Sequence, residues 1–108
     1  IQILGIGTNG HIAFNEPGSS RYSATRIVDL TDNTINDNSR FFDPLEPIPT
    51  QAFTMGLSSI LDAKRIYLMA NGKHKEKILE EAVYGDIHEG LPASYLQQHP
   101  NCEVLYCD

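Results

Sequence analysis

The spacing of apolar residues along the chain predicts a small set of strands and helices. Residues 1–6 are nearly continuous in isoleucine and leucine, which predicts a strand buried on both faces of a parallel sheet. Residues 65–72 and 102–108 predict two further strands. Between them, residues 74–85 carry apolar side chains at helical spacing and end on Gly85, which predicts an amphipathic helix with a glycine cap.

The middle of the chain has shorter and weaker patterns. Residues 25–30 alternate as a strand does, and Thr31 and Asp32 are both suited to cap a short helix that runs to Arg40. Residues 43–50 contain Pro44, Pro47 and Pro49, which exclude regular structure and predict a semi-rigid surface loop. The remaining predictions are a short strand at 51–55 and short helices at 56–63 and 92–99.

Strands that alternate with helices in this order predict the α/β class, with a parallel sheet covered by helices on both faces. At 108 residues the chain is one domain at most. Because its first residue already belongs to a predicted buried strand, we expect residues 1–108 to be a partial domain whose earlier part is absent.

Charge and cysteine content narrow the choice of partners and compartment. The net charge of −6 opposes binding to nucleic acid or to an anionic membrane surface, and no apolar run is long enough to span a bilayer. Cys102 and Cys107 lie in one predicted strand at a spacing that points them to opposite faces. Two unpaired thiols favour a cytoplasmic location.

The stretch GIGTNGHIAFNEPGSS, residues 5–20, follows the first predicted strand. Gly5, Gly7 and Gly10 have the G-x-G-x-x-G spacing of a dinucleotide-binding loop. That loop must lead into a helix, but Pro17 and Gly18 end the segment after seven residues. A nucleotide cofactor is therefore disfavoured.

The same stretch holds His11, Glu16 and Asn9 within eight residues. An imidazole paired with a carboxylate can move a proton between the ring oxygen and a hydroxyl of a sugar. The alternative is structural, with His11 bonded to buried carbonyls and Glu16 capping the next segment. A metal site is less favoured than either, because His11 and Glu16 are the only close pair of ligands.

A cluster of cations near residue 75 indicates a bound anion. Lys73, His74, Lys75 and Lys77 fall in the first turns of a predicted helix, where the dipole disfavours positive charge. An anion such as phosphate would reverse that effect, and Lys75 is the ligand we select. The alternative is that these lysines point outward and are solvated.

Five segments in order, GIGTNGHIAFNEPGSS, TRI, NSRFF, TMGLSSILDA and PASYLQQHP, resemble the glucosamine-6-phosphate deaminase family over essentially the whole chain. The resemblance implies a three-layer Rossmann-like fold, of which this chain is the C-terminal portion. It also implies conversion of glucosamine 6-phosphate to fructose 6-phosphate and ammonia, without an organic cofactor. The partner would be a small sugar phosphate, and monomer and homo-oligomer both remain open.

The resemblance assigns roles to particular residues. His11 would assist sugar ring opening, Glu16 would work with it, and Asn9 would orient the imidazole. Arg40 and Lys75 would bind the substrate phosphate. Residues 30–50 would form the active-site lid.

In the family, the aspartate that moves the C2 proton belongs to the earlier part of the domain, so we expect residues 1–108 alone to be inactive. Two other functions remain open. One is a 6-phosphogluconolactonase of the same fold, and the other is a sugar-phosphate sensor without turnover.

Overall fold

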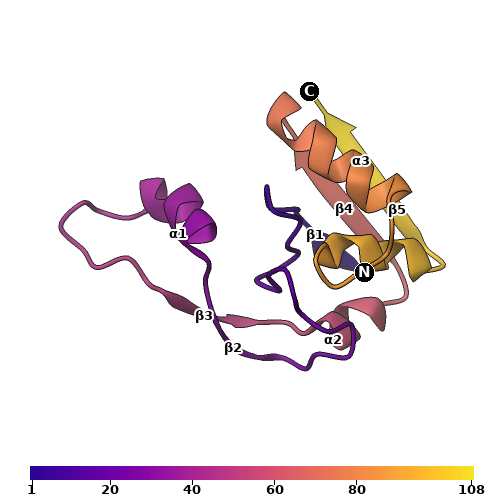
Figure 1. The fold of residues 1–108 in the computed structure, drawn as a ribbon, viewed down its shortest axis with the longest axis horizontal. Coiled ribbons are helices and arrows are strands. Elements are labelled where there is room, and N and C mark those ends of the chain that lie inside the picture. The colour runs from indigo at the N-terminus through magenta and orange to yellow at the C-terminus, as the bar shows by residue number, and fades with distance from the viewer.

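The computed structural model describes residues 1–108. Their strands form two separate β-sheets (Figure 1). The strands are β1 (Gln2–Leu4), β2 (Arg26–Asp29), β3 (Gln51–Thr54), β4 (Ile66–Asn71) and β5 (Cys102–Cys107). The α-helices are α1 (Asp32–Asn38), α2 (Leu57–Leu61) and α3 (Glu76–Tyr84). Three 3-10 helices are η1 (Ser39–Phe41), η2 (Lys73–Lys75) and η3 (Pro92–Gln98).

A three-stranded parallel sheet in the order β1-β4-β5 confirms the α/β class. Leu4 of β1 is opposite Leu68 of β4, and Ile66 of β4 is opposite Cys102 of β5. The carboxyl ends of β1 and β4 therefore reach the same edge of the sheet. The segments that follow these two strands contain the predicted proton-transfer residues and Lys75, one of the two predicted phosphate ligands.

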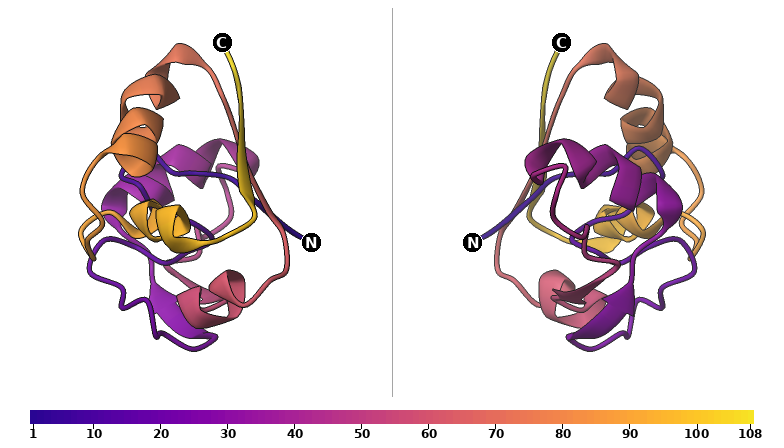
Figure 2. Two further views of the ribbon diagram at one scale, coloured as in Figure 1. Left: turned by 90° about the vertical axis from the view of Figure 1, so that its right-hand side faces the viewer. Right: turned by 90° about the vertical axis from the view of Figure 1, so that its left-hand side faces the viewer.

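Within these residues the helices cover one face of the sheet. Figure 2 shows α3 and η3 on one side of the strands, with the other side bare. Ile3 is 64% exposed and Met69 is 49% exposed on that bare face. The prediction that residues 1–6 are buried on both faces is thus wrong for this chain, because no helix of residues 1–108 covers the bare face of the sheet.

The segment from 26 to 54, which we call the arm, projects from the sheet (Figure 1). In it β2 and β3 form a separate antiparallel ribbon, with Arg26 opposite Thr54. The predicted strands at 25–30 and 51–55 are thus confirmed, but they do not join the parallel sheet. They pair with each other because α1 and the proline-rich loop return the chain beside β2.

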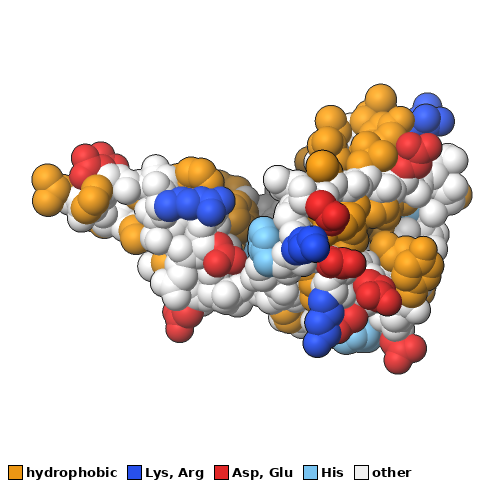
Figure 3. Space-filling view, turned by 90° about the horizontal axis from the view of Figure 1, so that it is seen from above, with side chains coloured by type: hydrophobic (Ala, Val, Ile, Leu, Met, Phe, Trp, Pro, Cys, Tyr) orange, Lys and Arg blue, Asp and Glu red, His pale blue; other side chains and the backbone are white.

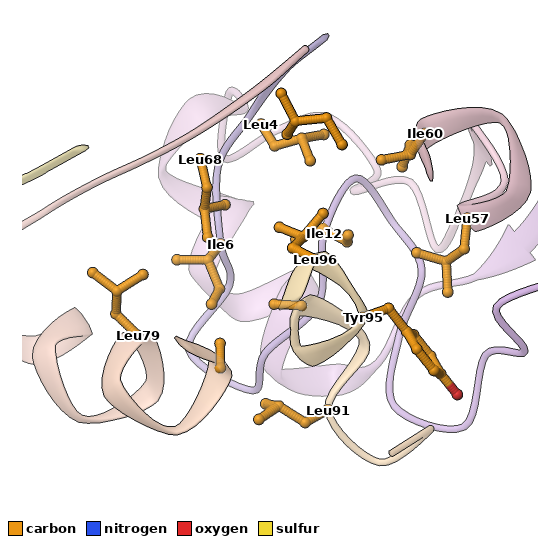
Figure 4. Close-up of a cluster of buried hydrophobic side chains, with 13 residues drawn as sticks. Leu4, Ile6, Ile12, Leu57, Ile60, Leu68, Leu79, Leu91, Tyr95 and Leu96 are labelled. Carbon is orange, nitrogen blue, oxygen red and sulfur yellow. The ribbon is translucent and has the colours of Figure 1, made fainter. Parts of the chain in front are cut away.

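The remaining residues, which we call the body, contain the hydrophobic core. Leu68, Ile12 and Ile60 are almost fully buried between the sheet and the helices (Figure 4). No residue between positions 13 and 56 belongs to this cluster of 13 side chains. The arm is therefore attached to the body without a shared apolar core.

Two predicted helix caps agree with the structure. Thr31 caps α1, and its side chain accepts a hydrogen bond from the backbone N–H of Thr34. Gly85 is the C-cap of α3. Both cysteines are free thiols, and no helix is both long and apolar enough to cross a membrane.

Candidate active site

A cleft of about 580 Å³ lies where the arm meets the carboxyl edge of the sheet. It brings together His11 from the loop after β1, Lys75 from η2 and Arg40 from η1. Figure 3 looks onto this hollow, with basic side chains on the arm and imidazole and basic side chains on the body. Three residues that are far apart in sequence thus line one cavity.

The glycines of the first loop make room for side chains and not for a dinucleotide. A Cβ on Gly7 would lie 2.1 Å from the His11 ring, so this glycine lets the imidazole lie against the backbone. Gly10 has a φ of 89°, and a Cβ there would lie 2.1 Å from Leu91. No helix follows the loop before β2, so the loop lacks the helix N-terminus on which the pyrophosphate of a dinucleotide would lie.

Asn9 and Glu16 lie behind His11 and fix its tautomer. The Asn9 amide donates to Glu16 Oε2 at 2.8 Å, so its carbonyl oxygen faces the imidazole. That oxygen is 2.7 Å from His11 Nδ1, which must therefore carry the proton and donate it. His11 lines the cleft with Nε2 free as a base, whereas Asn9 and Glu16 do not line it.

Burial lowers the pKa of His11 below its ordinary value of 6.5. The charge of Lys75 lowers this pKa further, while the carboxylates of Glu16 and Asp37 act to raise it. Glu16 Oε2 lies 3.5 Å from Nδ1, and both side chains are largely buried. The imidazole is consequently neutral near pH 7, the form that accepts a proton.

Lys75 is held at the edge of the cleft by the body. It belongs to a 3-10 turn ahead of α3 and not to the α-helix itself, and its ammonium donates to the carbonyl oxygen of Ile6. Burial lowers the pKa of Lys75, and the charge of Asp37 partly offsets this. Lys73 and Lys77 are exposed and do not line the cleft.

Arg40 reaches the same cleft from the arm. It lies in η1, directly after α1, and it is exposed. Its guanidinium carbon is 4.7 Å from the centre of the Phe41 ring, a cation–π contact. Two cations, one from each part of the molecule, thus face a volume that can hold an anion.

Three residues near the cleft were not among the predicted site residues. Asp37 and His74 line it, and Thr34 of α1 contacts Glu16. Asp37 precedes Arg40 by three residues on a predicted helix, so helical spacing could have placed the two side chains together. Nothing in the sequence signals Thr34, because its partner belongs to another loop.

The residues of the cleft and the parallel sheet together define an α/β protein in which two cationic side chains line a cleft beside a largely buried histidine. The chain belongs to the family of glucosamine-6-phosphate isomerases and 6-phosphogluconolactonases, whose model matches residues 1–106.

Curated relatives are named glucosamine-6-phosphate deaminase. The Staphylococcus haemolyticus protein is 55% identical over 108 residues, which is 100% of this chain and 45% of that protein. The Streptococcus sanguinis protein is 54% identical over 105 residues, which is 97% of this chain and 45% of that protein. The chain thus spans less than half the length of these relatives.

Solved structures show the same fold. A monomeric glucosamine-6-phosphate deaminase is 44% identical, with a TM-score of 0.94 over 98% of this chain and 44% of its own. The match to a putative 6-phosphogluconolactonase from Neisseria gonorrhoeae is more distant, with 23% identity and a TM-score of 0.67 over 98% of this chain and 44% of that one. The second likeness shows the fold alone.

Proposed function

We propose that these residues form part of the active site of a glucosamine-6-phosphate deaminase, which converts its substrate to fructose 6-phosphate and ammonia. The observation that carries this proposal is the shared cleft, in which a neutral imidazole faces two cations. Relatives named glucosamine-6-phosphate deaminase are identical to this chain at about half of its residues.

The imidazole supplies the first proton transfer. Nε2 of His11 accepts a proton from the sugar hydroxyl at C1 and returns it to the ring oxygen, which opens the ring. Asn9 holds Nδ1–H, so the ring cannot turn or change tautomer, and Glu16 stabilises the imidazolium that forms. These are the roles expected of the three residues.

The phosphate binds in the same cleft, at Lys75 and Arg40. Lys75 offers a point charge, and Arg40 offers a planar guanidinium that can contact two phosphate oxygens. A bound dianion favours the charged form of Lys75, against the burial that lowers its pKa. The arm residues 30–50, which include Arg40, would close over the sugar as a lid.

We propose this activity for the complete polypeptide that contains these residues, and we place it in the cytoplasm. The base that moves the C2 proton is expected from the portion of the relatives that the chain does not span. Residues 1–108 alone should therefore bind phosphate but not turn over substrate.

The deciding experiment supplies the complete polypeptide with glucosamine 6-phosphate and measures ammonia release, with 6-phosphogluconolactone as the competing substrate. Ammonia release supports the deaminase. Hydrolysis of the lactone alone would reject it in favour of the second family activity, and binding of both without turnover would indicate a sensor. The higher identity to deaminases than to the lactonase structure favours the first outcome.

A further inference from the structure

Glu16 is held by two parts of the molecule. Oε2 accepts the hydrogen bond from Asn9 of its own loop, whereas Oε1 accepts a 2.6 Å hydrogen bond from the Thr34 hydroxyl of α1. Thr34 is fully buried, although the helix that carries it shares no residue with the hydrophobic core. A buried hydroxyl on a carboxylate is among the stronger neutral-to-charged hydrogen bonds.

The Thr34 hydroxyl is itself fixed in place. The Thr34 hydroxyl accepts a hydrogen bond from the Thr31 hydroxyl at 3.1 Å, and the backbone N–H of Thr34 donates to the same Thr31 oxygen. Its oxygen lies 3.5 Å from His11 Nδ1, beside the stronger bond from that nitrogen to Asn9. The N-cap of α1 therefore aims this hydroxyl at the carboxylate.

Arg40 follows Thr34 by six residues on the same continuous helical segment. The other side-chain bonds between α1 and the body, from Asn33 to Thr8 and from Thr8 to Asp37, are exposed and compete with water. The Thr34–Glu16 bond is thus the buried point at which α1 contacts the proton-transfer residues.

We propose that Thr34 is a positioning residue, whose hydroxyl holds the Glu16 carboxylate against His11 and so couples the place of α1, and of the phosphate ligand Arg40, to proton transfer. The catalytic part of this inference rests on the proposed deaminase function. The Glu16 carboxylate has room to turn away from His11, because Glu16 also lines a second hollow, of about 450 Å³, which shares no lining residue with the cleft.

The first test compares Thr34→Val with Thr34→Ser in the complete polypeptide. The valine keeps the shape but removes the hydroxyl, so kcat should fall roughly 10- to 100-fold, the effect of one charged hydrogen bond, while KM changes little. Thr34→Ser should restore kcat to within about threefold, since it keeps the donor. Equal kcat in the valine variant and the wild type would overturn the proposal.

The second test needs no turnover, so it separates this inference from the proposed function. Titration of the His11 ring by NMR should show a lower pKa in Thr34→Val, because the carboxylate that raises it turns away. The other charges that face His11, on Asp37 and Lys75, are unchanged by the substitution. An unaltered His11 pKa would refute the link even in a protein with no deaminase activity.

A matched control separates positioning from general loss of stability. Ser94 is fully buried, and its hydroxyl bonds only to the backbone of His88, away from the cleft. Ser94→Ala should lower the unfolding midpoint without moving the His11 pKa or kcat. Thr34→Ala is run beside Thr34→Val, and a lowered His11 pKa in either folded variant supports the proposal, whereas a Ser94→Ala shift of equal size would overturn it.

Discussion

The body and the arm each supply one cation to the cleft, but they are held together by different forces. The body places Lys75 and His11 on a sheet edge beside a hydrophobic core that consists mostly of leucine and isoleucine. The arm places Arg40 through a helix whose only buried residue is the polar Thr34. Because hydrophobic burial is the larger stabilising effect, we expect the body to be rigid and the arm to be the adjustable side of the cleft.

The largest effect should come from the imidazole of the body. His11→Gln keeps a polar side chain but removes the titrating base, so kcat for ammonia release should fall roughly 10²- to 10⁴-fold, the usual contribution of general acid–base catalysis. His74→Gln is the matched control, since His74 lines the same cleft but forms no ion pair with a carboxylate. Equal losses in the two variants would remove the role assigned to His11.

The second prediction compares the packing of the two parts. Leu68 is 1% exposed in the body, whereas Ile27 is 59% exposed on the arm. Leu68→Ala should lower the free energy of unfolding by about 2 to 5 kcal/mol through the cavity it leaves, and Ile27→Ala by less than about 0.5 kcal/mol. Urea denaturation of the complete polypeptide measures both, and similar losses would show that the arm has a core of its own.

The third prediction concerns the cation of the body. Lys75→Ala should raise KM with little change in kcat. The variant loses a charged hydrogen bond to the phosphate, which contributes roughly 1.5 to 3 kcal/mol to substrate binding. Lys77→Ala, which removes an exposed lysine two residues away, should leave KM unchanged. A rise in both would instead indicate a diffuse effect of net charge.

Arg40 on the arm should matter less for the same ligand. It is exposed and solvated, so Arg40→Ala should raise KM only about two- to fivefold, and added salt should reduce the difference from the wild type. Lys75→Ala should be less sensitive to salt, since its ammonium is partly buried. If Arg40→Ala has the larger effect on KM, the arm closes on the substrate more tightly than this cleft indicates.

The body could be predicted from sequence better than the arm, and the reason is physical. Continuous apolar runs and helical spacing predicted β1, β4, β5 and α3. The cluster of cations pointed to Lys75, which lines the cleft, and its role as a phosphate ligand stays a prediction. The exposure of Ile3 could not be predicted, because a run of apolar residues predicts burial but does not identify the residues that would cover each face of the strand.

On the arm, local patterns identified the strands and the Thr31 cap but not their partners. The pairing of β2 with β3 and the contact of Thr34 with Glu16 are set by nonlocal geometry, which residue spacing does not encode. Arg40 was found only through the family resemblance, since an exposed arginine after a short helix has no distinguishing pattern.

The smallest effect should be a dependence of stability on pH that comes from His11. Its pKa in the folded protein lies below 6.5, so the unfolded chain binds the proton more readily. The free energy of unfolding should therefore fall as the pH drops below about 6.5 towards the folded-state pKa, and this contribution should be constant above that window. His11→Gln removes the group, so its stability should decline less steeply than that of the wild type between about pH 7.5 and 5, as measured by urea denaturation at each pH. Parallel curves would mean that the imidazole is as well hydrated in the folded protein as in the unfolded chain. Burial would then not lower the pKa of His11, and it could not explain a neutral base in the cleft.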